Sequence, residues 1–190
     1  MRKESGTPDT RDDIVLAGIR CVVRDGLDGA SMASIAAEAG VSKALLHYHF
    51  TDRAHLLAEM ADVLGRRLAV RERAIFARSV GTAAIDALWQ WLTGELTRGE
   101  LRGLLLLGTL TDETVEGVTT AVNQTRRNST STTVEHLFAR LGLTPRVSVT
   151  LIAEAAMTFN EGLALRGQLD RATARTSFDV FWLAILSLGD

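Results

Sequence analysis

The chain has 190 residues, of which 46% are hydrophobic and 23% are charged, with two prolines and a formal net charge of −2 at pH 7. This composition is typical of a folded globular chain with enough apolar residues for a sizeable core. The near-zero net charge gives no overall attraction to nucleic acid or to an anionic membrane. A nucleic-acid-binding function would therefore have to come from the placement of individual side chains.

The sequence also indicates a cellular compartment. No uninterrupted apolar run approaches the ~20 residues that a membrane-spanning helix needs. The residues after Met1 are polar and charged, without the apolar segment of a secretory signal. Cys21 is the single cysteine, which excludes an internal disulfide and suits a reducing environment. We therefore expect a cytoplasmic protein.

Three short helices are predicted at the start of the chain. The first begins at Thr10 and should end at Asp25-Gly26, because a glycine with positive φ often ends a helix. Ser31 is a good N-cap for a second helix, which Gly40 ends. Ser42 follows after two residues and predicts a third helix over Lys43–His49.

Helices are predicted over most of the remaining chain. After the Thr51-Asp52 cap, they run from Arg53 toward Arg78, from a cap at Thr82 past Leu96, over Leu101–Leu110, over Glu113–Leu141, from Thr144-Pro145 to Arg166-Gly167, and over Arg171–Leu188. No stretch alternates with a period of two for long enough to predict a sheet. The predicted fold class is all-α, with a small N-terminal part and a larger helical bundle.

The second and third helices, separated by Gly40-Val41-Ser42, have the spacing of a helix-turn-helix. Leu46 and Phe50 lie four residues apart and can pack against the neighbouring helices. The third helix would then present Lys43, Ala44, His47 and Tyr48 outward, as a groove-reading helix requires. A plain helical hairpin in a core has the same spacing, so the spacing alone leaves both readings open.

The residues themselves are more specific than their spacing. The run SMASIAAEAGVSKALLHYHF at 31–50, followed by TDRAHLL at 51–57, closely resembles the N-terminal signature of the TetR family of bacterial transcriptional regulators. The resemblance covers roughly residues 10–60, and FNEGLALRGQLD at 159–170 looks like the family's penultimate helix and the turn after it. His47 stands where the family most often has tyrosine, and Ala44 where glycine or proline is frequent.

The resemblance implies two domains and three partners. Residues 1–52 would form an N-terminal three-helix DNA-binding domain with the helix-turn-helix. Residues 53–190 would form a C-terminal helical bundle for effector binding and dimerisation. The implied partners are a palindromic double-stranded operator, a small-molecule effector and a second copy of the chain.

Candidate DNA contacts follow from this resemblance. We expect Lys43, Ala44 and Tyr48 to face the major groove, and Ser31, Ser42, His47 and Arg53 to hold phosphates. Residues 1–53 contain seven basic residues (Arg2, Lys3, Arg11, Arg20, Arg24, Lys43 and Arg53) and eight acidic ones (Glu4, Asp9, Asp12, Asp13, Asp25, Asp28, Glu38 and Asp52). Helix N-termini and the pairing of two half-sites must therefore supplement the side chains.

The bundle offers two further sets of candidates. For the effector, which we expect to be mostly apolar, they are Met60, Trp89, Leu92, Leu106, Met157 and Asn160. For the dimer interface they are Ile152, Ala155, Phe159, Phe178, Phe181, Trp182 and Ile185. Ordinary core packing within one chain is the alternative for every apolar member of both sets. Trp91 is unusual, because it falls off the apolar stripe from Ile85 to Leu96.

Other classes of site have less support. His47 and His49 lie about 200° apart around a helix, which argues against a metal site with His55. Cys21 lies on an apolar stripe and suits a buried, inert thiol. We expect no cofactor, no metal and no enzymatic activity. The leading hypothesis is a homodimeric transcriptional repressor that a small effector releases from DNA. The alternative is a ligand-binding helical protein of the same fold that does not regulate through DNA, with an enzyme as a distant third.

Overall fold

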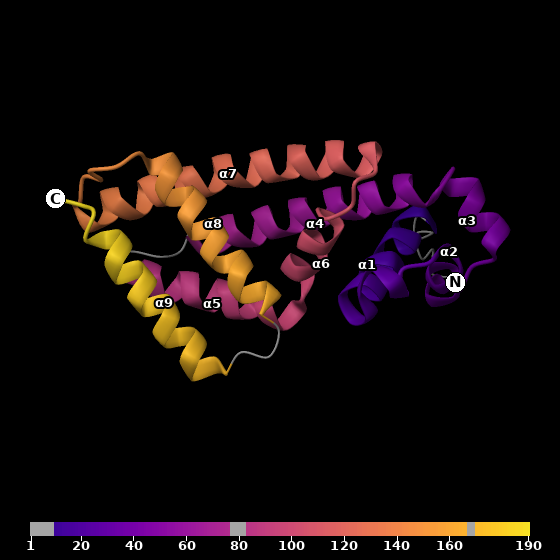
Figure 1. Cartoon of the computed structure of the whole chain (residues 1–190), viewed down its shortest axis with the longest axis horizontal. Coiled ribbons are helices and arrows are strands. Elements are labelled where there is room, and N and C mark those ends of the chain that lie inside the picture. Colours follow the sequence, from indigo (N-terminus) through magenta and orange to yellow (C-terminus); the bar gives the residue numbers. More distant parts are fainter. Residues whose placement is uncertain (1–9, 77–82, 167–169) are drawn as a thin grey trace, which may run out of the picture. The chain divides into compact units, whose positions relative to one another are not determined.

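The computed structural model describes residues 10–76, 83–166 and 170–190, with the side chains of residues 75 and 76 left aside. The regular secondary structure of these ranges is helical (Figure 1). The helices are α1 (Thr10–Gly29), α2 (Met32–Ala39), α3 (Lys43–His49), α4 (Arg53–Phe76), α5 (Ala83–Arg98), α6 (Glu100–Leu107), α7 (Glu113–Leu141), α8 (Val149–Leu165) and α9 (Arg171–Leu186). The predicted all-α class is confirmed. Within these ranges, no helix is both long and apolar enough to cross a membrane.

The early helix boundaries follow the local signals in the sequence. Ser31 Oγ accepts a hydrogen bond from the Ser34 amide at 3.0 Å, and Ser42 Oγ accepts one from the Leu45 amide at 3.1 Å. Gly40 ends α2 in the left-handed conformation, with φ 69° and ψ 26°. Gly26 also has positive φ, but α1 resumes after it and ends at Gly29. Arg78 and Thr82, the predicted end of the fourth helix and cap of the fifth, lie outside the described residues.

The predicted start of α8 at Thr144-Pro145 is wrong. The helix begins at Val149, and Pro145 instead forms an isolated antiparallel bridge with Gly189. The Thr144 amide donates to the Asp190 carbonyl at 3.0 Å, and the Arg146 amide donates to the Leu188 carbonyl at 2.8 Å. The fixed φ of proline suits extended backbone as well as a helix start. Pairing with the last residues of the chain therefore decides its conformation.

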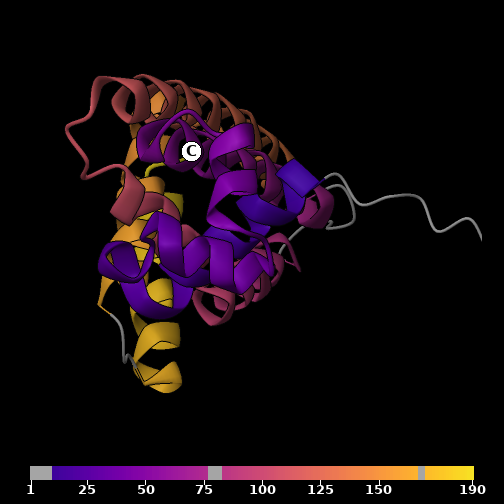
Figure 2. The ribbon, with the colours of Figure 1, turned by 90° about the vertical axis from the view of Figure 1, so that its right-hand side faces the viewer.

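The chain divides into two compact units. The first contains the described residues up to Leu64 together with Gly103–Thr120, and the second contains Gly65–Arg102 with Ala121–Asp190. In the first unit α1, α2 and α3 pack around fully buried side chains such as Ile14, Ile35 and Leu46 (Figure 2). Helix α4 supplies residues to both units.

A close approach of two helices sets the packing of the first unit. Gly18 of α1 faces Met60 of α4, and an added Cβ at Gly18 would lie only 2.6 Å from the Met60 Sδ. Met60 is itself fully buried. A larger residue at position 18 would force the Met60 side chain to move.

The second unit combines an aromatic core with a buried ion-pair network. Its core includes Trp89, Phe138, Phe178 and Trp182. Glu95 of α5 is 0% exposed and accepts hydrogen bonds from Arg71 Nε at 2.6 Å, Arg71 Nη2 at 2.8 Å and Arg98 Nη1 at 3.1 Å. Arg71 also donates to Glu100 of α6 at 2.6 Å. Arg71 thus ties α4 to α5 and to the start of α6.

This network generates the first prediction. Glu95→Ala leaves the half-buried Arg71 guanidinium without its main acceptor, so the free energy of unfolding should fall by about 3–5 kcal/mol. Glu154→Ala is the matched control, because it breaks an exposed pair with Arg127 and should cost at most about 1 kcal/mol. Urea denaturation of both variants measures the difference. Equal losses would show that the buried network does not carry this stability.

Candidate nucleic-acid interface and ligand cavity

Helix α3 has one buried face and one exposed face. Leu46 and the following Phe50 are buried, while Lys43, Ala44, His47 and Tyr48 are all exposed. Tyr48 is 83% exposed, the most of any large apolar or aromatic side chain in the described ranges. The predicted outward row is thus confirmed as a surface, while its contacts with bases and phosphates remain a prediction.

The turn between α2 and α3 is held by backbone hydrogen bonds. The Val41 amide donates to the Ala36 carbonyl at 3.0 Å, and the Gly40 amide donates to the Ala37 carbonyl at 3.1 Å. Phe50 completes the far end of α3, where its amide donates to the Leu46 carbonyl at 2.9 Å. Short, well-capped ends give a helix of seven residues a defined orientation.

Salt bridges fasten α1 to α2. Arg20 Nε donates to one oxygen of Glu38 at 2.7 Å, and Arg24 Nη1 donates to the other at 3.0 Å. These hydrogen bonds hold the pKa of Glu38 below its ordinary value. Two of the basic residues in this unit are therefore engaged in its own structure.

Arg11 fastens α1 to the end of α3. Its guanidinium pairs with Glu59 of α4, lies 4.5 Å from the ring centroid of Phe50, and donates to the His49 carbonyl at 3.4 Å.

The His55 amide donates to Asp52 at 2.9 Å at the start of α4, which lowers the pKa of Asp52. No group of three or more potential metal ligands occurs in the described ranges. Cys21 is buried, and burial raises the pKa of its thiol.

Arg53, a predicted phosphate contact, has a structural role that the sequence analysis did not anticipate. Its Nε donates to the Ala30 carbonyl at 3.1 Å, and its Nη2 donates to the Leu27 carbonyl at 3.0 Å. The side chain thus fixes the connection between α1 and α2. A hydrogen bond from its remaining donors to phosphate stays a prediction.

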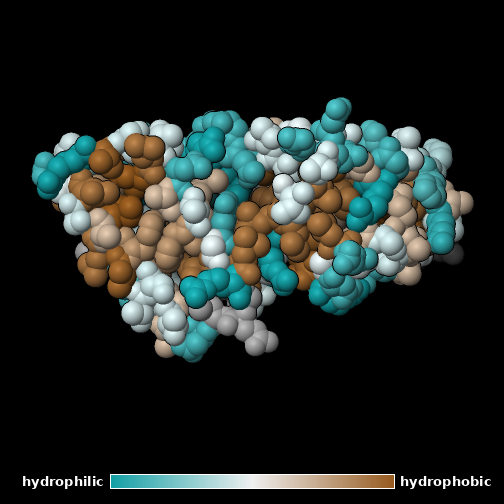
Figure 3. Space-filling view, viewed as in Figure 1, coloured by the Kyte–Doolittle hydropathy of each residue, from teal (hydrophilic) through white to brown (hydrophobic). Residues whose placement is uncertain are grey.

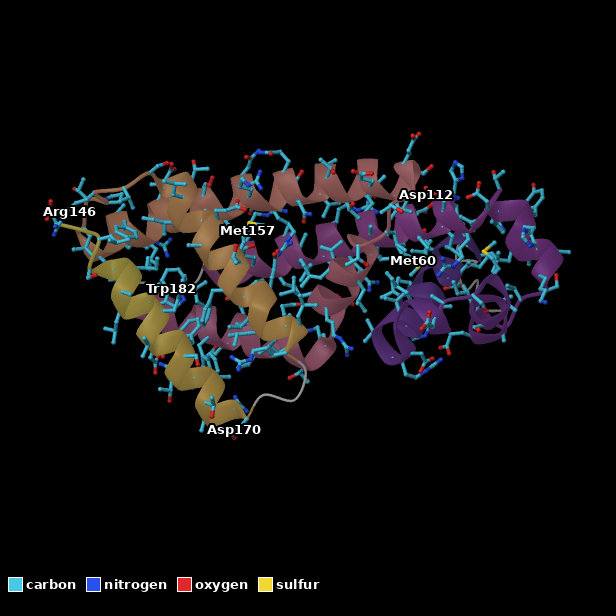
Figure 4. All side chains as sticks on the ribbon, viewed as in Figure 1. Met60, Asp112, Arg146, Met157, Asp170 and Trp182 are labelled. Atoms are coloured by element: carbon cyan, nitrogen blue, oxygen red, sulfur yellow. The ribbon has the colours of Figure 1, made fainter. Side chains whose placement is uncertain are left out.

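The second unit contains a small internal cavity. The volume that the centre of a water molecule can occupy in this cavity is about 20 Å³. This is room for little more than one water molecule. The wall of the cavity combines apolar side chains with a group of buried polar ones. The lining residues are Glu72, Leu88, Trp91, Arg126, Thr130, Thr133, Val134, Ala156, Met157, Asn160 and Trp182. Met157 and Trp182, on α8 and α9, are labelled in Figure 4.

Two of the six predicted effector residues, Met157 and Asn160, line this cavity. The others do not. Met60 is buried in the first unit and Leu106 also belongs to it, while Leu92 is fully buried in the core of the second. Trp89 packs against Phe178, with 5.3 Å between ring centroids. Trp91, which falls off the apolar stripe, is the tryptophan of α5 that lines the cavity.

Four residues predicted for the dimer interface are buried within the single chain. Ile152, Phe178, Trp182 and Ile185 all belong to its own core, as the alternative interpretation held. Phe159 and Phe181 are partly buried, and their rings stack with 4.4 Å between the ring centroids. Ala155 is exposed. Only Ala155 of the predicted set is thus fully on the surface.

Different residues form the exposed faces of α8 and α9. On α8 an uncharged exposed row consists of Leu151, Ala155, Thr158, Gly162 and Leu165, with the exposed Glu154 beside it; on α9 a second such row consists of Ala172, Thr176, Val180, Leu183 and Ser187, with the exposed Arg171 at its start. We call these two uncharged rows the α8–α9 surface. Leu151 is 66% exposed and Leu183 is 70% exposed. Figure 3 shows apolar residues gathered over this part of the second unit.

A family model matches the N-terminal part of the chain. Residues 14–60 match the sequence model of the bacterial regulatory proteins of the tetR family. This part of the chain is similar to the N-terminal domain of that family. The match spans α1, α2, α3 and the beginning of α4, which are the elements that position Lys43 and Tyr48.

One curated relative matches part of the chain. It is the HTH-type nicotine-responsive transcriptional repressor HdnoR of Paenarthrobacter nicotinovorans, 33% identical over 96 residues. The match covers 47% of this chain and 50% of the relative, so the chain spans about half the length of the curated relative it matches.

Solved structures match nearly the whole chain. A transcriptional regulator from Rhodococcus sp. Rha1 has a TM-score of 0.76 at 20% identity, covering 95% of this chain and 97% of that one. A TetR-family regulator from Agrobacterium tumefaciens has a TM-score of 0.76 at 18% identity, covering 93% and 97%. A TetR regulator from Haloarcula marismortui has a TM-score of 0.75 at 18% identity, covering 96% and 99%. At these identities the likeness shows the fold.

The second prediction concerns the structural role of Arg53. Arg53→Ala removes the donor to two backbone carbonyls, so the free energy of unfolding should fall by about 1–3 kcal/mol even without DNA. Arg102→Ala, on the exposed surface of α6, should change it by less than about 0.5 kcal/mol. Thermal unfolding of the free protein measures both. Unchanged stability in Arg53→Ala would contradict the structural role.

Proposed function

We propose that the chain is a homodimeric, DNA-binding transcriptional repressor that a small-molecule effector releases from its operator in the cytoplasm. The observation that carries the proposal is the exposed row Lys43, Ala44, His47 and Tyr48 on a short capped helix in the part of the chain that matches the tetR-family model. The partial relative is a transcriptional repressor that responds to a small molecule, which supports both repression and release.

The chemistry of the exposed row suits both kinds of DNA contact. The Lys43 ammonium can donate to guanine O6 and N7, and the Ala44 methyl can contact a thymine methyl in the major groove. Tyr48 extends far enough from the surface to reach a base edge. Ser31, Ser42, His47 and Arg53 are proposed to hold phosphates, with the N-termini of α2 and α4 adding backbone donors.

The α8–α9 surface is the proposed dimer interface. Its two rows present leucine, valine and small residues, as the core of a subunit interface does, and the charged Glu154 and Arg171 lie at their edge, where an interface has its polar rim. A two-fold dimer through this surface would pair two helices from each subunit into a four-helix arrangement. It would place two copies of α3 at a fixed separation, as a palindromic operator requires.

The third prediction tests base recognition. Lys43→Ala should relax the preference for one base pair in each half-site, with a loss of about 1–3 kcal/mol on the best sequence. His47→Ala should weaken all sequences alike and reduce the salt dependence of binding. Both side chains are exposed, so neither change should affect folding. Binding to a library of DNA flanking the gene, at several salt concentrations, measures the difference.

Arg171→Ala is the control, because it removes an exposed positive charge from the second unit. It should leave the affinity for DNA unchanged. If the wild-type protein binds no DNA in this library, the alternative of a ligand-binding protein that does not act on DNA gains support. If Lys43→Ala lowers affinity equally for every sequence, Lys43 contacts phosphate and the assignment to the major groove is wrong.

The fourth prediction tests the dimer. Leu183→Asp and Leu151→Asp each place a carboxylate in the proposed apolar interface, where it would lose its hydration without gaining a partner. Each should convert dimers into monomers at micromolar concentration while the subunit stays folded. Val70→Asp is the matched control, because Val70 is also exposed, at 57%, but lies on α4. Light scattering that finds unchanged dimers in both variants would eliminate this interface.

A further inference from the structure

The internal cavity of the second unit contains a carboxylate that has no hydrogen-bonded cation among the described residues. Glu72 of α4 is 7% exposed, and its Oε1 accepts one hydrogen bond, from the Thr130 hydroxyl at 3.3 Å. Burial raises the pKa of this carboxyl group, and the positive charge of Arg126 offsets only part of the effect. Burying an acid in this way costs stability, so a compensating role is expected.

Arg126, whose positive charge lowers the pKa of Glu72, is already paired with other residues. Arg126 of α7 is 6% exposed, and its Nη1 donates to Glu161 of α8 at 2.8 Å and to Asn123 at 3.3 Å. When both acids are ionised, Glu72, Arg126 and Glu161 together carry one net negative charge. Arg73 of α4 also lowers the pKa of Glu72 through its positive charge, but the hydrogen bond to the Glu72 carboxylate comes from Thr130 and not from either arginine.

Two tryptophans complete the wall of the cavity. The indole Nε1 atoms of Trp91 and Trp182 are buried and have no hydrogen-bond acceptor among the described residues. Both rings line the same cavity as Glu72. Indole faces attract cations, and indole N–H groups buried without an acceptor favour a ligand that supplies one.

From these groups we propose that the cavity is the effector site and that it selects a compact organic amine. The protonated nitrogen would pair with Glu72 and lie against the indole rings, and an acceptor atom of the ligand would receive an indole N–H. This inference rests on the proposed function only for the consequence of binding, which is release from DNA. The selection of an amine follows from the cavity itself.

The cavity must enlarge to admit such a ligand. Its present free space of about 20 Å³ is far less than an aromatic amine occupies. Met157 lines it and has a flexible, unbranched side chain that can repack around a ligand. Opening the cavity would displace groups against α4, to which Glu72 belongs, and α4 also contributes to the DNA-binding unit. Binding of the effector and release of DNA would thus both act through α4.

An anionic effector fits these contacts less well. A ligand carboxylate would lie beside Glu72, and the Arg126 donor that faces the cluster is already used by Glu161 and Asn123. Basic side chains instead line an open groove of the same unit, whose wall includes Arg73, His136 and Arg140. The cavity and the groove thus differ in the charge of their lining residues.

The fifth prediction uses three probes of similar size, each with a phenol oxygen that can accept an indole N–H: tyramine, tyrosol and 4-hydroxyphenylacetate. Binding to the full-length protein is measured by thermal shift and by tryptophan fluorescence, without DNA. The amine should bind best, and Glu72→Gln should weaken it at least tenfold, because glutamine keeps the acceptor for Thr130 but removes the charge. Trp182→Phe should weaken it about threefold, because the phenyl face attracts a cation less strongly.

Glu154→Gln is the control and should not change the affinity for the amine, since that carboxylate is exposed on α8. A second measurement needs no ligand: Glu72→Gln should unfold at the same temperature as the wild type or a few degrees higher, because it removes a buried charge. Glu161→Gln should unfold at a lower temperature, because it weakens the acceptor of the buried Arg126.

The inference is overturned if the amine binds no better than the alcohol or the acid, or if Glu72→Gln binds it as the wild type does. Addition of the amine to the protein–DNA complex is a separate measurement. If the amine binds through Glu72 without releasing DNA, the cavity is an amine site and the proposed induction fails. If other molecules release DNA while amines do not bind, the regulatory function stands and this site is wrong.

Discussion

The ion pair between Arg71 and Glu95 fixes the rotation of α4 in the second unit. Glu95 is fully buried and accepts both arms of the Arg71 guanidinium, so a small rotation of α4 would leave buried charges without partners. Glu72 is the next residue and projects about 100° further around the helix. The pair that stabilises the unit therefore also holds the Glu72 carboxylate toward the cavity, where its burial is costly.

Local signals in the sequence were sufficient to predict the helices α2 and α3 and the exposed side of α3. The bounds of α3, Lys43–His49, match the prediction because Ser42 caps the helix and Phe50 follows it in extended backbone. A helix this short has one buried residue, Leu46, and its position settles which side chains remain outside. The structural role of Arg53 could not be predicted from local signals, because the carbonyl groups that accept its hydrogen bonds lie 23 and 26 residues away in sequence.

The second unit could be predicted much less completely. Apolar periodicity shows that one face of a helix is covered, but it does not show what covers it. Phe178 and Trp182 form an apolar face on α9 that a partner or the same chain could bury, and the chain buries them itself. The polar wall of the cavity depends on Glu72 and on Arg126, which is paired with Glu161, and these residues come from three helices far apart in sequence. The local signals of that site were Trp91, off its apolar stripe, and the predicted effector residues Met157 and Asn160.

The charges of the first unit explain why a DNA-binding function would need two subunits. Arg11, Arg20 and Arg24 pair with carboxylates of the same unit, and Arg53 donates to backbone carbonyls. Lys43 is thus the exposed basic side chain on α3 itself, and one such contact gives weak binding at physiological salt. Linking two copies makes the second contact intramolecular, which raises affinity without any new charge. On the proposed function, the uncharged α8–α9 surface therefore contributes to DNA affinity as directly as the residues of α3.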